Sequence, residues 1–245
     1  MPPADYAYIG AVLLGAYFIR GISGFGSGLV AVPLLALKLP LTFVVPLILL
    51  TDFTASLVLG GLNLKQVDWR EIRRLLPPGL IGVATGTVLL VSLPKTPMLI
   101  GLGTIVILFA LRNLVFAGRE PKPIPTWWAW PAGLAGGTVG AMFGTGGPPY
   151  VIYLSHRLAD KGLLRATFSG LFFMEGLARI SSFTISGLML DLNLAWAYLA
   201  AMPVALVALW LGSHAHSRLS NTQMMRAISL ILLGSGLSLY FKALH

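Results

Sequence analysis

A helix-breaking tetrapeptide occurs twice in this chain, and each copy interrupts a long apolar stretch. Phe25-Gly26-Ser27-Gly28 lies in the first half of the sequence, and Phe143-Gly144-Thr145-Gly146 lies 118 positions later in the second half. Backbone groups that such a break leaves free are tolerated inside a bilayer only where they are buried in protein or line a cavity. Two copies in a very hydrophobic chain therefore predict a duplicated membrane protein with an internal cavity between its repeats.

The composition agrees with this prediction. The chain is 56% hydrophobic and 10% charged, and its mean hydropathy is +0.84, whereas soluble domains carry about 25% charged residues. The net charge of +9 does not indicate nucleic-acid binding, because the basic residues lie between the apolar segments, as the positive-inside rule expects. The absence of cysteine excludes disulfides and thiolate metal sites. Because the first residues lack a basic region, we expect no cleaved signal peptide.

Apolar segments follow the same order in both halves. A crossing helix needs about 20 apolar residues, and each interrupted stretch, residues 6–37 and 127–155, is followed by three such segments. These spans are 41–62, 72–93 and 96–117 in the first half, and 163–190, 192–213 and 222–244 in the second. The fold class is therefore an all-α polytopic membrane protein of ten helical segments. Its predicted repeats are 1–117 and 127–245, joined by a linker at 118–126.

The distribution of basic residues distinguishes parallel from inverted repeats. If each interrupted stretch crosses once, the basic residues fall about evenly on the two sides of the membrane. If each is a hairpin that returns to its starting side, one side collects most of them. That side holds Lys65, Arg70, Arg73, Arg74, Arg119, Lys122, Arg157, Lys161, Arg165 and Arg218, and the other holds Lys38, Lys95 and Lys242. Basic loops mark the cytoplasm, so we predict two inverted-topology repeats, a cytoplasmic linker and extracytoplasmic termini.

The breaks are predicted to form an anion site near the bilayer midplane. Both helices of each hairpin are expected to be short, and residues 27–37 and 146–155 cover only about 15–18 Å at 1.5 Å per residue. Helix N-termini offer unpaired N–H groups and partial positive charge, and glycine permits close approach. Ser27 and Thr145 can cap a helix or donate a hydroxyl to a ligand. The predicted ligand residues are Gly26, Ser27, Gly28, Gly144, Thr145, Gly146 and Gly147. The alternative is that these small residues only let helices pack closely.

Four ionisable side chains lie in or beside the apolar segments, where charge is costly. Asp52 and Glu175 occupy similar depths in corresponding helices of the two halves, Arg179 follows Glu175 by one helical turn, and Arg20 precedes the first break. In the functional interpretation, Arg20 and Arg179 attract the substrate, while Asp52 and Glu175 serve proton coupling or gating. In the structural interpretation, the four form two ion pairs, Glu175–Arg179 and Asp52–Arg20, that only join helices. The sequence leaves both open.

Both broken segments resemble signatures of a known family. Residues 21–34 are similar to the N-terminal signature of the sulfite exporter TauE/SafE family of membrane transporters, and residues 140–150 to its signature in the second half. The resemblance covers essentially the whole chain. It implies transport of small anions, such as sulfite, sulfonates and other organic acids, with the segments around 26–28 and 144–147 lining the pathway. Because the family includes exporters and proposed importers, it does not imply a direction.

The sequence therefore predicts a secondary carrier of the inner membrane that moves a small anion by alternating access, with proton coupling if an acid takes part. It predicts no enzyme, cofactor, metal or nucleic-acid partner, and no ATP-binding motif is present. One alternative is a passive anion channel, which needs neither Asp52 nor Glu175. Another is a rhomboid-like protease with Ser23, in Gly21-Ile22-Ser23-Gly24, as nucleophile. That chemistry needs a base beside the serine, and all four histidines fall in loops or at segment ends.

Overall fold

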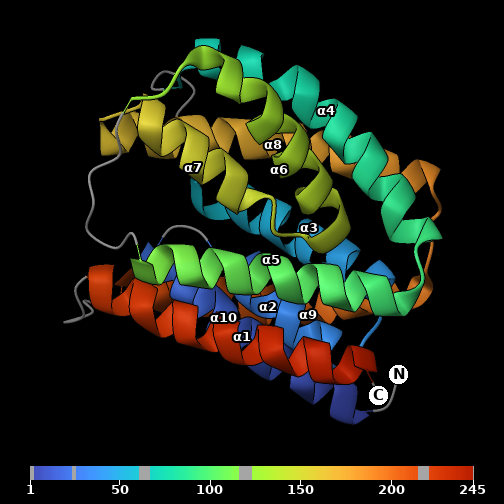
Figure 1. Cartoon of the computed structure of the whole chain (residues 1–245). Coiled ribbons are helices and arrows are strands. Elements are labelled where there is room, and N and C mark those ends of the chain that lie inside the picture. The colour runs from blue at the N-terminus through green and yellow to red at the C-terminus, as the bar shows by residue number, and fades with distance from the viewer. Residues whose placement is uncertain (1–2, 24–25, 61–66, 116–122, 215–220, 245) are drawn as a thin grey trace. The chain divides into compact units, whose positions relative to one another are not determined.

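The structure, a computed structural model, describes residues 3–23, 26–60, 67–115, 123–214 and 221–244 (Figure 1). Within these ranges the regular secondary structure is entirely helical, as predicted: ten α-helices and one 3-10 turn. In chain order they are α1 (Pro3–Ser23), α2 (Ser27–Ala36), α3 (Leu41–Gly60), α4 (Trp69–Ser92), α5 (Lys95–Val115), η2 (Thr126–Trp128), α6 (Ala129–Phe143), α7 (Gly147–Arg157), α8 (Lys161–Ile185), α9 (Leu192–His214) and α10 (Asn221–Leu244).

Some sequence predictions fall on residues or side chains that the structure does not describe. The proposed nucleophile Ser23 is one of them, because only its backbone is described. The others are Gly24, Phe25, Lys65, Arg119, Lys122, Lys161, Arg165, His216, Arg218 and His245, which all lie outside the described residues or side chains.

The helix bounds follow the predicted spans, with one exception in the first hairpin. α2, α6 and α7 are short, with 10, 15 and 11 residues, but α1 has 21 residues. The prediction that both helices of each hairpin are short is therefore wrong for α1. The physical reason is that Pro3 suits a first helical turn and that the apolar run after it contains no proline before the tetrapeptide. At 1.5 Å per residue, α1 is about 31 Å long.

The helices form two compact units, and each unit draws on both halves of the sequence. Unit 1 comprises Met1–Thr51, Leu93–Arg119 and Asp191–His245, and unit 2 comprises Asp52–Ser92 and Glu120–Leu190. Unit 1 therefore contains the first hairpin (α1, α2) with α5, α9, α10 and the first part of α3. Unit 2 contains the second hairpin (α6, α7) with α4, α8 and the rest of α3.

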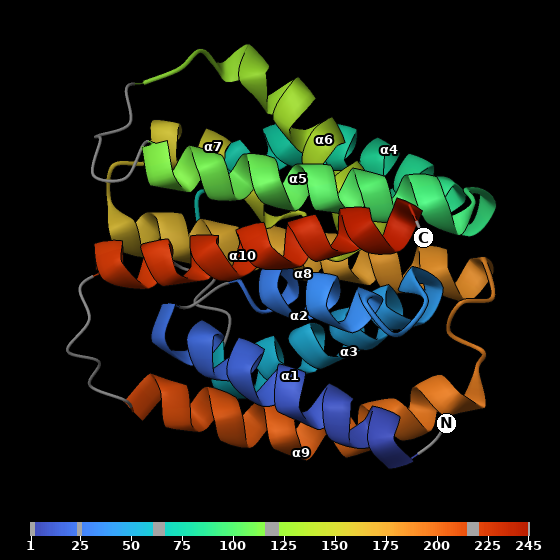
Figure 2. The same cartoon turned by 60° about the horizontal axis from the view of Figure 1, so that its bottom comes forward.

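The same helix partnership occurs in each unit with the roles of the halves exchanged. In unit 1, α1 packs along α9, and α2 contacts α1; α5 runs beside α10 (Figure 2). In unit 2, α6 packs along α4, and α7 contacts α6 (Figure 1). α1 and α6 are the first helices of the two hairpins, and α9 and α4 are each the second span after a hairpin. A duplication of the chain therefore explains both arrangements. The inverted orientation of the halves stays a prediction.

Glycines bring the paired helices into backbone contact. A Cβ atom on Gly86 of α4 would lie 2.5 Å from the carbonyl oxygen of Thr138 in α6. On α9, a Cβ atom on Gly212 would collide with the carbonyl oxygen of Phe18 and would come within 3.0 Å of Gly21 in α1. Gly86 and Gly212 correspond in the two halves, 126 positions apart. Such close crossings of small residues are how helices associate in lipid, where burial of apolar side chains provides little drive.

The outer faces of several helices are apolar. α4, α5 and α9 are long and apolar enough to cross a membrane, judged by length and composition. Val88, Leu108 and Leu199, one on each of these helices, are 61%, 61% and 59% exposed. Large exposed apolar surfaces on a soluble protein are a liability, whereas in a bilayer they face the lipid chains. The fold is therefore that of a membrane protein, as the composition predicted.

The glycine crossings can be tested by adding one methyl group. Gly86→Ala and Gly212→Ala should each lower the free energy of unfolding by about 1–3 kcal/mol, because the new Cβ atom meets backbone that cannot move aside. Thermal unfolding of the purified protein in a neutral detergent measures the effect.

The matched controls are Gly10→Ala and Gly15→Ala on α1, where a Cβ atom meets nothing within 4 Å. Alanine has the higher helix propensity, so these two should unfold at the same temperature as the parent or above it. Equal unfolding temperatures for all four variants would show that the crossings are not tight.

Candidate functional site

Corresponding glycines of the two tetrapeptides adopt the same unusual backbone conformation. Gly26 has φ of 96° and Gly144 has φ of 63°, and both lie in the left-handed region. The only other described residue at positive φ is Gly187. A side chain at such a position costs about 1–2 kcal/mol, so the chain turns here because glycine stands here. The two copies of the motif therefore share the left-handed glycine, although α2 begins directly after Gly26 and α7 begins only at Gly147.

The first break, in unit 1, places a basic side chain beside the start of α2. Gly26 is the residue preceding α2, and its carbonyl accepts the first helical hydrogen bond, from the N–H of Val30 at 3.2 Å. Ser27 is buried, and its Oγ accepts a hydrogen bond from Arg20 Nη1 at 3.2 Å. The Arg20 guanidinium also lies 5.9 Å from the centre of the Tyr17 ring. Positive charge and the N-terminal end of a helix thus occur together.

Of the two roles predicted for Ser27, capping is excluded. Gly26 occupies the capping position of α2, and no side chain makes a capping hydrogen bond there. Ser27 is instead the first residue of the helix, which turns its hydroxyl toward Arg20. Gly28 follows in the first turn and is buried.

The second break, in unit 2, folds back on the helix that precedes it. Gly144 ends α6, and its N–H donates to the carbonyl of Gly140 at 2.9 Å. A Cβ atom on Gly146 would lie 2.6 Å from the carbonyl oxygen of Gly136 and 2.8 Å from the Cα of Gly140. α7 then begins at Gly147, with Pro148 in its first turn as the sequence predicted. No residue larger than glycine fits at Gly146.

A buried hydroxyl without a partner lies in this second break. Thr145 is 3% exposed, and its Oγ1 has no hydrogen-bond partner among the described residues. Gly146 precedes α7 without any side-chain capping bond, so Thr145 does not cap the helix. Leaving a buried hydroxyl unpaired costs about 1–3 kcal/mol. Buried polar groups are nearly always satisfied by protein or by another molecule.

A buried ion pair on α8 lies against the same part of α6. Glu175 and Arg179 are 1% and 4% exposed, and Arg179 Nε lies 3.9 Å from Glu175 Oε1. Arg179 Nη1 donates to the carbonyl of Gly140 at 3.2 Å, and a Cβ atom on Gly140 would lie 3.0 Å from Glu175 Oε1. The predicted pairing of Glu175 with Arg179 is therefore confirmed. Gly140 joins the pair to the break, because Gly146 packs on it as well.

The pair is loose for a buried salt bridge. Within the described residues, Arg179 Nε and both carboxylate oxygens of Glu175 lack a hydrogen bond. Two buried charges that lie 3.9 Å apart, with no hydrogen bond between them, recover little of their desolvation cost. Together with Thr145, the break in unit 2 thus holds a hydroxyl, a guanidinium nitrogen and a carboxylate that are all buried and incompletely satisfied.

Asp52 and Glu175, which lie at similar depths in corresponding helices, differ in burial. Asp52 lies near the middle of α3, as Glu175 lies near the middle of the corresponding helix α8. Glu175 is fully buried, whereas Asp52 is only partly buried. The site residues of the first break, including Arg20, belong to unit 1, and those of the second break, including Arg179, belong to unit 2.

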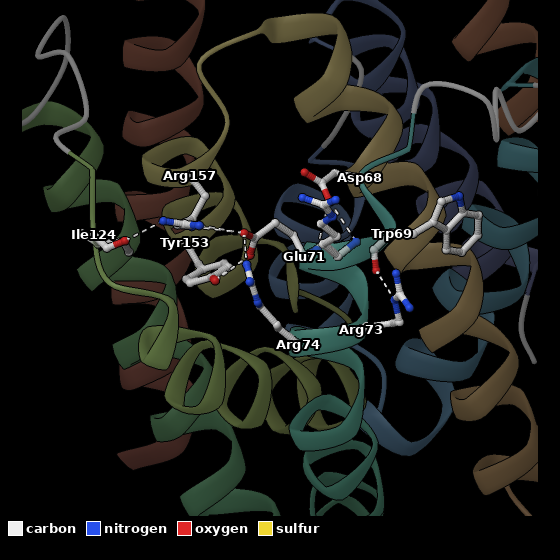
Figure 3. Close-up of polar contacts among 9 residues, drawn as sticks. Asp68, Trp69, Glu71, Arg73, Arg74, Ile124, Tyr153 and Arg157 are labelled. Atoms are coloured by element: carbon white, nitrogen blue, oxygen red, sulfur yellow. Dashed lines mark hydrogen bonds and ion pairs between the residues drawn. The ribbon is translucent and has the colours of Figure 1, made fainter.

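A second polar cluster, which the sequence analysis missed, is centred on Glu71 of α4 (Figure 3). Glu71 is 3% exposed, and its Oε1 receives Arg74 Nη1 at 2.7 Å and Arg157 Nη2 at 3.0 Å. Its Oε2 accepts a hydrogen bond from Tyr153 Oη at 2.6 Å, and Arg157 Nη1 donates to the carbonyl of Ile124 at 3.1 Å. The cluster fixes the C-terminal end of α7 to the start of α4.

The sequence held a signal for this cluster. Glu71 is the one acid in the run Trp69-Arg70-Glu71-Ile72-Arg73-Arg74, and an acid amid basic residues at a helix start is a candidate for a buried partner. The positive-inside pattern accounts for the arginines of this run as loop charge and assigns no role to Glu71. Only the contact with Arg157, 86 positions away, shows its role.

Comparisons with known proteins agree with the geometry. The sequence matches the family described as Sulfite exporter TauE/SafE over residues 8–239. It is 30% identical over 193 residues to a "Probable inner membrane transporter protein TsaS" of Comamonas testosteroni, and the match covers 79% of this chain and 81% of that protein. No solved structure matches the chain.

The Glu71 cluster generates a stability prediction. Glu71→Gln should lower the free energy of unfolding by about 2 kcal/mol, because it leaves two guanidinium groups without their shared counter-ion. The partial exposure of both arginines limits the loss. Tyr153→Phe removes one hydrogen bond and no charge, so it should cost about 1 kcal/mol.

Arg73→Gln is the control, since the Arg73 side chain is exposed and bonds only to the carbonyl of Trp69 in the described structure. It should unfold at the parent temperature in the same detergent assay. The order Glu71→Gln, Tyr153→Phe, Arg73→Gln from least to most stable is expected. A Glu71→Gln variant as stable as Arg73→Gln would contradict a structural role for the cluster.

Proposed function

Because the chain belongs to the sulfite exporter TauE/SafE family, a family of membrane transporters, we propose that it is a secondary carrier of a small anion such as sulfite or a sulfonate. The observation that carries the proposal is the buried Thr145 hydroxyl, which has no protein partner in the described structure. It stands two residues before the first residue of α7, in a segment whose neighbours include a buried arginine. A tetrahedral or pyramidal oxyanion supplies the hydrogen-bond acceptors that this arrangement lacks.

The chemistry of the second break suits a small oxyanion. The N–H groups of the first turn of a helix have no partner within the helix and carry partial positive charge. Anions bind there because several N–H donors converge on one point. In our proposal the backbone around Gly146 and Gly147 supplies these donors, Thr145 Oγ1 adds a hydroxyl, and Arg179 balances the charge. The glycines matter because a side chain would deny the anion close approach to the backbone.

We extend the proposal to the first break. Its turn also has a left-handed glycine and is followed by a short helix, with Arg20 and Ser27 in place of Arg179 and Thr145. In our proposal Gly26, Ser27, Gly28, Gly144, Thr145, Gly146 and Gly147 line the path of the anion. Transport then follows alternating access, in which movement of the repeats opens the path to one side at a time. We also propose a multi-pass inner-membrane location with both termini extracytoplasmic.

Proton coupling is assigned to the buried carboxylate. An anion that enters beside Arg179 competes with Glu175 for the same guanidinium. A carboxylate that loses its counter-ion in a dry environment favours the neutral form, so we propose that anion binding and proton uptake by Glu175 are linked. Asp52 is the second candidate, and its partial exposure suits a gating role nearer to water.

Thr145→Val tests the proposed ligand hydroxyl, because stability and binding should change in opposite directions. Replacing an unpaired buried hydroxyl by a methyl group should raise the free energy of unfolding of the anion-free protein by about 1 kcal/mol. The same change should weaken sulfite binding about tenfold, since a hydrogen bond to a charged group contributes roughly 1.5–3 kcal/mol. Calorimetry with sulfite and sulfoacetate measures the affinity, and thermal unfolding measures the stability.

The matched control is Thr87→Val. Thr87 is also buried, but its hydroxyl donates to the carbonyl of Val83 at 2.8 Å and accepts from Ser182 at 2.9 Å. It should lose stability and keep its anion affinity. If Thr145→Val instead lost stability like Thr87→Val and bound both anions like the parent, Thr145 would not be a ligand residue.

Two alanine variants with the same backbone strain test whether the first break belongs to the transport path. At both Gly26 and Gly187 the φ angle is positive, 96° and 79°, and a Cβ atom meets nothing within 4 Å. Gly26→Ala and Gly187→Ala should therefore each cost about 1–2 kcal/mol of stability. Only Gly26→Ala should also slow transport, by at least about tenfold.

Counterflow of labelled sulfoacetate into vesicles preloaded with the unlabelled anion measures the transport rate of each variant. A carrier concentrates the label transiently, whereas a passive channel cannot. Equal counterflow in the two variants would remove Gly26 from the path, and a parent protein without counterflow but with rapid downhill flux would be a channel.

A further inference from the structure

A groove with basic and aromatic walls lies in unit 2, and neither the proposed function nor the family match assigns it a role. Its volume is about 410 Å³, and its walls include Arg73, Arg74, Pro77 and Pro78 of α4 with Trp127 and Trp130 of η2 and α6. We propose that this groove binds the headgroup phosphate of an anionic phospholipid. This assignment is independent of the anion carried through the protein.

Arg73 and Arg74 both have guanidinium nitrogens that can bind a ligand. Within the described residues, the one side-chain hydrogen bond of Arg73 runs from Nε to the carbonyl of Trp69 at 3.2 Å, which leaves Nη1 and Nη2 for a ligand (Figure 3). Arg74 uses Nη1 for Glu71, and its side chain is still 43% exposed. The planar guanidinium fork matches a phosphate group, which it can bind through two parallel hydrogen bonds.

Among the described residues that line the groove or pair with its lining, positive charge is in excess. Glu71 is the acid that pairs with the lining residue Arg74, and it is shared between Arg74 and Arg157. Arg73, Arg74 and Arg157 carry three positive charges and Glu71 carries one negative charge, so two positive charges remain. A phosphodiester carries one negative charge, so an anionic lipid complements the groove, whereas a zwitterionic headgroup brings its own cation with it.

The aromatic wall favours a lipid over a free phosphate. Trp127 and Trp130 are 59% and 62% exposed, and the Trp127 ring stacks on Trp128 with 4.6 Å between ring centres. Exposed tryptophans beside basic residues at the ends of apolar helices mark the headgroup level of a membrane. Pro77 continues the exposed apolar surface along α4, and the buried Pro78 lines the groove beside it. A lipid fills both environments at once, with its phosphate on the arginines and its glycerol and upper chains on the rings.

The location agrees with where anionic lipids act on membrane proteins. The groove lies on the side that the charge distribution assigns to the cytoplasm, because Arg73 and Arg74 belong to the basic set. Basic pockets between helices on this side bind anionic headgroups, and each basic residue near the surface strengthens attraction severalfold.

The experiment uses the purified full-length protein in a neutral detergent. Short-chain phosphatidylglycerol and phosphatidylcholine are titrated separately, and bound lipid is counted by native mass spectrometry. We expect saturable binding of phosphatidylglycerol at one site and weaker binding of phosphatidylcholine. Arg73→Gln should weaken phosphatidylglycerol binding about fivefold. Arg73→Lys keeps the charge but lacks the planar guanidinium group, so its phosphatidylglycerol affinity should lie between those of the parent and of Arg73→Gln.

The matched control is Arg70→Gln, since Arg70 is exposed on the same helix start but does not line the groove. It should bind phosphatidylglycerol like the parent. Thermal unfolding shows whether Arg73→Gln stays folded, and Trp130→Leu provides a second variant that removes the aromatic wall without removing charge. Equal affinity for the two lipids, or equal affinity in Arg73→Gln and Arg70→Gln, would overturn the proposal.

Competition with inorganic phosphate distinguishes a site for a lipid headgroup from a site for free phosphate. Millimolar phosphate should not displace phosphatidylglycerol if the rings and prolines contribute to binding. Displacement at that concentration, with loss of lipid selectivity, would identify a site for free phosphate instead and would also overturn the assignment to a lipid.

Discussion

The left-handed turn at Gly26 and Gly144 is the constraint on which the rest of the structure depends. A helix cannot continue through these positions, so each hairpin ends one helix and starts another inside an apolar protein. A start of this kind leaves N–H groups that need partners. In unit 2 the hydroxyl of Thr145 is buried without a partner among the described residues. The glycine conformation that breaks the helix is therefore also the basis of the anion site that we propose.

The second organising element is close packing between helices from different halves of the chain. α1 with α9 and α4 with α6 are equivalent pairs, and both depend on glycine where the backbones touch. The first helix of each hairpin therefore packs along a helix of the other half. Duplication followed by such an exchange keeps two similar breaks in one chain and leaves each free to acquire its own charged neighbour, Arg20 in one and Arg179 in the other.

Much of the fold could be predicted because bilayer-spanning helices need long apolar runs, and helix breaks need glycine. The spans, both breaks and the Glu175–Arg179 pair follow from composition and from one-turn spacing. The length of α1 was missed because hydropathy does not show where an unbroken helix starts. The non-capping roles of Ser27 and Thr145 depend on which glycine takes the capping position, and the Glu71 cluster depends on a contact between α4 and α7 that no local pattern contains.

The most direct measurement concerns access to the two breaks during transport. The natural chain has no cysteine, so Ser27→Cys and Thr145→Cys can be labelled in vesicles by a small polar thiol reagent without background. Both positions are buried, as is the control Ala16→Cys in α1. If the breaks line the anion path, both cysteines are labelled, sulfoacetate slows the labelling, and Ala16→Cys stays unlabelled. Labelling no faster than at Ala16→Cys, or labelling that sulfoacetate does not slow, would contradict an anion path through the breaks.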